Sequence, residues 1–256
     1  PPIAPYDAAG WTLAYLMNVK FDRILENFDG PFEKIPYGEL LKSNQKPLPS
    51  GSGYVLSSAA NESYTAVNEL LKSGAEVYRN AKDGSFYVPS SAKAKTVLEK
   101  GYGMKVTSAS KPTNAIKIAP SRIAIWDTYG GSMPSGWMRY IMEQHQFNAT
   151  VIYPQDIDKG NLKDKFDVIV FVGGSIPAYS TNPAAAPAGR GGFGTPALES
   201  IPEEFRNRIG RVSQDKSIPQ LKSFLEAGGK IVTIGSATNL AAHLDLPVRN
   251  AMVELV

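Results

Sequence analysis

The chain of 256 residues contains no cysteine and only two histidines, His145 and His243. The absence of cysteine excludes disulfides, thiolate–metal sites and a cysteine nucleophile, but it leaves the cellular compartment open. Two histidines are too few for a His-rich metal site. A Ser–His–acid triad would have only these two residues as candidate bases.

Long apolar runs and basic runs are missing as well. No stretch approaches the roughly 18 apolar residues that a membrane-spanning helix needs, so no membrane span is expected. The formal net charge is only +3, and lysine and arginine form no stripe, so nucleic-acid binding is not expected. Hydrophobic residues make up 43% and charged residues 20%, which is typical of a globular protein with a sizeable core.

The two ends of the sequence suggest a piece of a longer polypeptide. The chain begins with Pro1 and carries no signal segment, and residues 252–256 form an apolar run. We therefore expect a C-terminally truncated fragment, with any targeting signal upstream of it.

Alternating helix and strand patterns predict two α/β halves, 1–115 and 116–256, joined near 111–121. Whether the two halves share one sheet is left open by the sequence. In the first half we expect Asn61 and Ser91 to act as helix N-caps and Asp83 to begin a turn. The expected helices are 8–17, 61–73 and 92–100, the expected strands are 19–25, 53–57, 75–79, 85–88 and 104–107, and 29–52 reads as a surface connection.

The second half predicts a parallel sheet with helices on both faces, because its strands are strongly apolar and alternate with helices. Ser135 is expected to cap the first helix. A low-complexity loop, 179–196, is interpreted as a surface excursion, with a mobile lid as the alternative. The expected strands are 122–126, 149–153, 166–172 and 230–234, and the expected helices are 135–146, 220–227 and 237–244.

Ligands of open parallel sheets bind beyond the carboxyl ends of the strands, and three loops of the second half fall there. In the first loop Gly130, Gly131 and Ser132 precede a helix and offer a generic anion site, without the spacing of a dinucleotide fingerprint or a P-loop. In the second loop Gly173 and Gly174 could direct two amides at an oxyanion, or they could simply permit the turn.

The third loop, 233–239, has the strand–turn–helix setting of a nucleophile elbow. The pattern small–x–nucleophile–x–small places Ala237 at the elbow between Gly235 and Asn239, and alanine has no reactive group. Ser236 is the alternative elbow residue, in a poorer register because two β-branched residues would flank it. A base is also missing, since His243 lies about 10 Å further along a helix, too far for a direct hydrogen bond to Ser236.

Aromatic residues could serve a binding function instead of catalysis. Trp126, Tyr129 and Trp137 lie in or beside the first loop and could contact a small ligand. Aromatic side chains in such positions more often pack inside α/β folds.

The residues of the second half resemble the class I glutamine amidotransferase-like fold, which is flavodoxin-like. The resemblance covers 122–248 and is carried by the Gly-rich first loop, the Gly-Gly pair after a buried strand and the elbow at 235–239. That family uses an elbow cysteine with a distant histidine and glutamate. Here the elbow is Ala237 or Ser236 and no histidine follows in the right place, so the resemblance implies the fold without the family's chemistry.

A second resemblance covers nearly the whole chain. It is to the region downstream of the peptidase domain in large, typically exported bacterial proteins of the zinc carboxypeptidase family M14. The segments that carry it are Pro5-Tyr6-Asp7, Trp11-Thr12-Leu13, 127–137, Tyr153-Pro154-Gln155-Asp156, 234–240 and 243–247. The resemblance implies a secreted or periplasmic location and the missing peptidase domain as a partner. Because this chain has no His-x-x-Glu, it also implies that zinc belongs to that domain and that no cofactor is bound here.

These observations lead to one leading hypothesis and two alternatives. The leading hypothesis is an accessory, non-catalytic region that acts as a scaffold or binds a small peptide or sugar at the three loops. One alternative is a serine hydrolase or amidotransferase-like enzyme that uses Ser236. The other is a stand-alone small-ligand-binding module.

Overall fold

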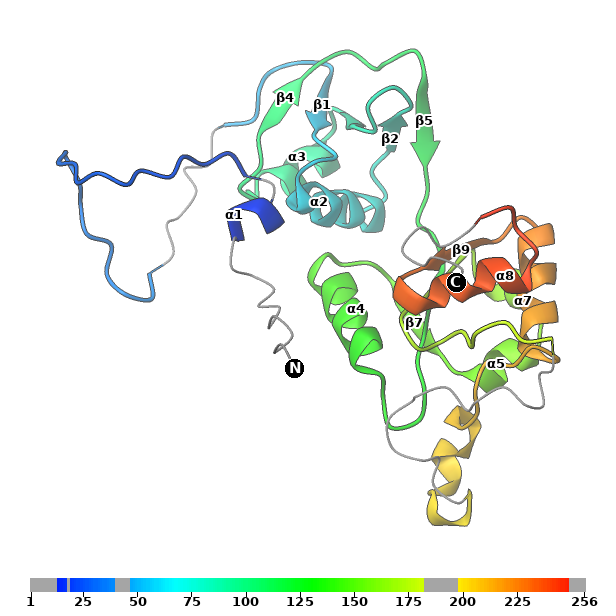
Figure 1. Cartoon of the computed structure of the whole chain (residues 1–256). Coiled ribbons are helices and arrows are strands. Elements are labelled where there is room, and N and C mark those ends of the chain that lie inside the picture. Colours follow the sequence, from blue (N-terminus) through cyan, green and yellow to red (C-terminus); the bar gives the residue numbers. More distant parts are fainter. Residues whose placement is uncertain (1–12, 18, 40–46, 182–197, 249–256) are drawn as a thin grey trace. The chain divides into compact units, whose positions relative to one another are not determined.

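The structure is a computed structural model that describes residues 13–17, 19–39, 47–181 and 198–248 (Figure 1). The chain forms two compact units, 1–43 and 44–256. In the described part of the first unit, one turn of helix, α1 (Leu13–Leu16), precedes a stretch without regular structure. The expected strand 19–25 is wrong, because its alternating side chains have no sheet to pack against and Phe21 and Ile24 are 44% and 61% exposed. Half of the expected helix 8–17, residues 8–12, lies outside the described residues, and the other half contains α1.

The second unit contains two separate sheets, so the two halves do not share one. The first is five-stranded, in the order β4-β1-β3-β2-β5, and the second is four-stranded, in the order β7-β6-β8-β9. The antiparallel sheet ends in the chain with β5 at Ile118, and the parallel sheet begins with β6 at Ile123. The predicted boundary at 115/116 stays a prediction.

Every pair of neighbouring strands in the first sheet is antiparallel. Helix α2 connects β1 to β2, and β3 lies between these two strands in the sheet. Helix α3 connects β3 to β4, and β1 lies between those two strands. The two βαβ units therefore interleave, which is the ferredoxin-like arrangement, with β5 added at the β2 edge. Its elements are β1 (Gly53–Leu56), α2 (Asn61–Lys72), β2 (Val77–Asn80), β3 (Phe86–Pro89), α3 (Ala92–Leu98), β4 (Val106–Ser108) and β5 (Ala115–Ile118).

Local sequence signals explain the two helices of this half. In α2 the buried residues Ala66, Val67 and Leu70 recur at helical spacing and face the core. Ser91 caps α3 as predicted, since its hydroxyl oxygen accepts the Ala94 N–H at 3.1 Å. The cap predicted at Asn61 is wrong, because Asn61 is already the first residue of α2.

The second sheet is parallel throughout, as predicted. Two short helices, α5 and α6, were not predicted because four or five residues carry too little periodicity. Its elements are β6 (Ile123–Trp126), α4 (Met133–Gln144), β7 (Ala149–Ile152), α5 (Pro154–Asp158), α6 (Leu162–Lys165), β8 (Val168–Phe171), the 3₁₀ helices η2 (Leu198–Ser200) and η3 (Glu203–Arg208), α7 (Ser217–Glu226), β9 (Lys230–Thr233), the 3₁₀ helix η4 (Gly235–Asn239) and α8 (Leu240–His243).

Both faces of the parallel sheet are covered, because alternate residues of its strands belong to different hydrophobic clusters. Ile169 and Phe171 of β8 belong to a cluster that includes residues of α5, α7 and α8. Val170, between them, belongs to a second cluster against which Met142 of α4 packs. The prediction of helices on both faces is therefore confirmed.

The start of α4 differs from its prediction. The N-cap is Ser132 rather than Ser135, and Pro134 lies in the first turn, where its missing N–H costs no hydrogen bond. Ser135 is fully buried, and its hydroxyl donates to the Trp126 carbonyl at 2.8 Å. The predicted loop 179–196 falls mostly outside the described residues.

Candidate functional site

The three loops named from the sequence follow β6, β8 and β9, which are consecutive neighbours in the parallel sheet. Parallel strands end at the same edge, so the three loops lie along the carboxyl edge of the sheet. We call them the β6 loop (127–132), the β8 loop (172–176) and the β9 turn (234–239).

The β6 loop surrounds a buried carboxylate, that of Asp127, which is 6% exposed. Its Oδ1 accepts the Thr128 and Ser132 N–H groups, both at 2.8 Å. The Gly131 N–H donates to the Thr128 carbonyl at 2.9 Å. The Gly131 and Ser132 amides, which the sequence suggested as part of an anion site, therefore already donate hydrogen bonds within the loop. The Asp127 carboxylate also places a negative charge beside them, so the geometry disfavours binding of an anion there.

The glycines of this loop have a conformational reason. Gly130 and Gly131 have φ angles of +84° and +81°, the left-handed region that only glycine adopts at little cost. The sequence signal for Asp127 is a carboxylate directly after an apolar strand and shortly before two glycines.

The β8 loop and the β9 turn come together through Ser236. The Gly174 N–H donates to the Ser236 hydroxyl oxygen at 2.9 Å. A second bond joins the same segments, from the Asn239 side-chain amide to the Ile176 carbonyl at 3.3 Å. The structure therefore brings together four of the predicted site residues, Gly173, Gly174, Ser236 and Asn239, with Ser236 and Gly174 exposed.

Gly235 is the left-handed residue of the β9 turn, with φ +62°. A nucleophile elbow carries its strain at this kind of position. Ala237, which the sequence pattern placed at the elbow, lies two residues later in η4 and is completely buried. The position that would present a nucleophile therefore holds glycine, and Ser236 follows it.

His243 contacts the β8 side of the site without contacting Ser236. Its Nε2 lies 2.8 Å from the Pro177 carbonyl oxygen, which requires Nε2 to carry the proton. Its ring meets the Tyr179 ring edge to face at 5.5 Å between centroids. Among the described residues its buried Nδ1 has no partner. No hydrogen bond in the described ranges connects either histidine to Ser236.

His145 lies at the end of α4 and joins it to α2 of the antiparallel half. Its Nδ1 is 2.9 Å from the Thr65 hydroxyl oxygen, and its carbonyl accepts the Asn68 side-chain amide at 2.7 Å. Nearby, hydrogen bonding by the Lys100 ammonium lowers the pKa of the Glu69 carboxyl. The contacts of His145 with Thr65 and Asn68 therefore indicate a structural role, the joining of α4 to α2.

The three aromatic residues have different surroundings. Trp126 is 5% exposed and belongs to the core of the sheet, and Tyr129 is half-buried. Trp137 on α4 is 63% exposed and meets Tyr140 edge to face at 6.1 Å. Trp126 is therefore a packing residue, and of the two tryptophans only Trp137 offers its ring to solvent.

A carboxyl group with a strongly lowered pKa, that of Asp167, lies at the opposite edge of the sheet. Hydrogen bonds from the Arg122 guanidinium hold the pKa of Asp167 far below its ordinary value, and Lys163 adds a further contact. Asp167 directly precedes β8 and Arg122 directly precedes β6. This ion pair links the starts of two strands, a structural role.

Across 13–17, 19–39, 47–181 and 198–248, no three carboxylate or histidine side chains are grouped so that they could hold a metal ion. No helix within the same ranges has both the length and the apolarity to cross a membrane.

Comparison with known proteins adds no relative. No protein-family model matches this sequence, and neither the curated proteins nor the solved structures contain a significant match to it.

Proposed function

We propose that the chain is an accessory, non-catalytic region of an exported zinc-carboxypeptidase-type protein, with a class I glutamine amidotransferase-like second half. In that role it contacts the peptidase domain and offers the β8 loop and β9 turn to a small peptide or sugar. The sequence resemblance motivates the peptidase link, the secreted or periplasmic location and the assignment of zinc to the peptidase domain.

The topology supports the fold part of the proposal. If β6, β7, β8 and β9 are numbered 1 to 4, the sheet order is 2-1-3-4. The flavodoxin-like sheet begins with the same order, and its ligand site lies at the switch point between strands 1 and 3. Here that point lies between β6 and β8, so the β6 and β8 loops flank it.

One observation carries the non-catalytic part: the Ser236 hydroxyl accepts the Gly174 amide and no described base reaches it. A serine nucleophile needs a base within about 3 Å to take its proton. His243, the nearer histidine in sequence, uses its Nε2 proton on the Pro177 carbonyl. The amide that could have bound an oxyanion is directed at the serine itself. What remains is a polar, solvent-exposed surface suited to binding.

The test uses the intact polypeptide with its peptidase domain. Ser236→Ala should leave carboxypeptidase turnover within twofold of the parent protein. Ser223→Ala on α7, away from the three loops, serves as the matched control for substitution of an exposed serine. Loss of turnover in Ser236→Ala, with unchanged thermal unfolding, would overturn the non-catalytic assignment.

A second measurement separates binding from hydrolysis. A fluorophosphonate probe should not label the chain, because Ser236 lacks a base. Time-dependent labelling that disappears in Ser236→Ala would establish the serine hydrolase instead. A thermal-shift screen of short peptides and sugars then tests the binding role, since a ligand at 100 times its Kd stabilises the folded state by about 2.7 kcal/mol.

A further inference from the structure

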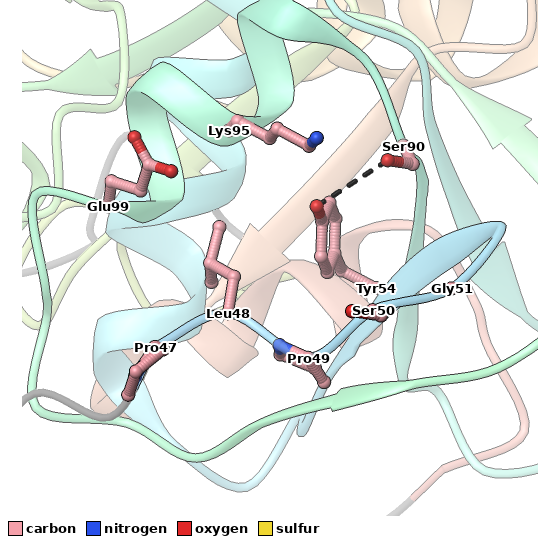
Figure 2. Close-up of a pocket in the computed structure, with 9 residues that line it drawn as sticks. All are labelled: Pro47, Leu48, Pro49, Ser50, Gly51, Tyr54, Ser90, Lys95 and Glu99. Atoms are coloured by element: carbon pink, nitrogen blue, oxygen red, sulfur yellow. Dashed lines mark hydrogen bonds between the residues drawn. The ribbon is translucent and has the colours of Figure 1, made fainter.

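The antiparallel half contains a pocket of about 570 Å³ that is separate from the carboxyl edge of the parallel sheet (Figure 2). Its walls come from the segment before β1, from β1 itself, from the residue that follows β3, and from α3 and its C-cap. The lining residues are Pro47, Leu48, Pro49, Ser50, Gly51, Tyr54, Ser90, Lys95 and Glu99.

Tyr54 supplies a buried hydroxyl to this pocket. The residue is 2% exposed, and its hydroxyl lies 3.4 Å from the Ser90 hydroxyl. Bonds between hydroxyl groups are normally 2.5–3.0 Å long, so this contact is weak. A buried phenol without a short hydrogen bond is costly, and a ligand atom in the pocket would remove that cost.

Lys95 brings a positive charge to the same place. Figure 2 shows its side chain extending from α3 toward the Tyr54 and Ser90 hydroxyls. Among the described residues, none forms a hydrogen bond or an ion pair with the Lys95 ammonium. One cation and two hydroxyl groups therefore converge at one end of the pocket.

The other end of the pocket is apolar. Pro47, Leu48 and Pro49 line it on the side away from Ser90 (Figure 2). Leu48 is half-buried and packs against the core of the antiparallel half. A ligand that fits both ends has a hydrogen-bonding anionic group and an apolar body.

We propose that this pocket binds a small organic monocarboxylate, with its carboxylate on Lys95, Tyr54 and Ser90 and its apolar group against Leu48. The charge count favours a monoanion, because Lys95 is the single cation among the described residues that line the pocket. A phosphate dianion would carry more negative charge than this one cation balances. The proposal is independent of the one made for the carboxyl edge, since the two sites share no residue and lie on different sheets.

The experiment is a calorimetric titration of the 256-residue chain with N-acetyl-leucine, which combines a carboxylate with an apolar side chain. N-acetyl-leucinamide, which has the same shape without the charge, and inorganic phosphate are the comparison probes. We expect saturable binding of N-acetyl-leucine that weakens as salt is added, and at least tenfold weaker binding of the amide and of phosphate.

Three variants assign the binding to this pocket. Lys95→Gln should weaken the affinity for N-acetyl-leucine about tenfold, since a charge-assisted hydrogen bond is lost. Lys93→Gln removes an exposed lysine from the same helix outside the pocket, and should leave the affinity unchanged. Tyr54→Phe keeps the buried ring and should weaken binding about threefold to tenfold. Far-ultraviolet circular dichroism of each variant establishes that it is folded.

The outcomes are distinct. Absence of saturable binding, equal binding of acid and amide, tighter binding of phosphate, or an equal effect of Lys93→Gln and Lys95→Gln would each overturn the proposal. Loss of binding in Ser236→Ala together with unchanged binding in Lys95→Gln would place the carboxylate at the carboxyl edge of the parallel sheet and refute the site assigned to Lys95.

Discussion

Replacing Gly235 by alanine should destabilise the parallel half by about 1–2 kcal/mol, the cost of a left-handed backbone for a residue with a Cβ. The φ angle of Gly235 is +62°. The added Cβ would meet the Gly173 Cα at 3.8 Å, an ordinary contact, so the cost comes from the backbone and not from a clash. Gly173→Ala is the matched control, because its new Cβ would also lie 3.8 Å from its neighbour, the Ser236 Oγ, and its φ is not positive.

Urea unfolding monitored by tryptophan fluorescence measures the effect, because Trp126 and Trp137 both lie in the parallel half. With a slope of about 2 kcal/mol/M, Gly235→Ala should lower the midpoint by about 0.5–1 M. Gly173→Ala should be neutral or slightly stabilising. Gly235→Asn should fall between them, since asparagine tolerates the left-handed region. Equal midpoints for the two alanine variants would refute the assignment of the turn to Gly235.

Three further substitutions test the packing and electrostatics that hold the two halves. Ser91→Ala should cost about 1 kcal/mol by removing the cap on Ala94, read from the urea midpoint and faster amide exchange in α3. Phe171→Ala should cost about 3–5 kcal/mol by opening a cavity in the core of the sheet, measured by the same unfolding. Arg122 holds the pKa of Asp167 below its ordinary value of 3.8, so the pair contributes stability above about pH 4 that is lost as the pH falls. Unfolding of Asp167→Asn across pH 2–7 should therefore show a shallower decline in acid than that of the parent chain.

The second sheet followed from the sequence because its strands are apolar enough to be buried on both faces. Ile169, Val170 and Phe171 form such a run, and all three are buried in β8. Strands of this kind pair in parallel under covering helices, which is what β6 to β9 do. The N-cap at Ser91 could also be predicted from the sequence, because a serine caps the helix that follows it without any contact to residues distant along the chain.

Predictions failed where local signals were ambiguous. Residues 19–25 alternate like a strand, but a strand needs a partner, and the described chain gives them none. The prediction of a cap at Ser135 is wrong, because Ser132 offers the same chemistry three residues earlier and Pro134 suits the first turn. Strand β5 was assigned to the connection between the halves, since its four residues lie between Pro112-Thr113-Asn114 and Pro120-Ser121, and the whole segment resembles one loop.

For the candidate site too, the sequence predicted the local turns, and the tertiary structure decided the contacts between distant residues. Glycines after β8 and β9 could be read as turn residues from the sequence, and the topology of a parallel sheet placed them at one edge. Only the tertiary structure shows that the Gly174 amide is directed at the Ser236 hydroxyl and that the buried Asp127 carboxylate occupies the amides of the β6 loop.

The sequence by itself determined the longer helices and the buried strands of the second unit, because periodicity and capping act over a few neighbouring residues. Only the tertiary structure decided that the first sheet is antiparallel and interleaved, that Gly235 carries the left-handed turn, and that Tyr54, Ser90 and Lys95 share a pocket. The physical reason is that these features depend on the register between strands and on side chains distant along the chain. Such contacts form when the whole core packs, and no local pattern encodes them.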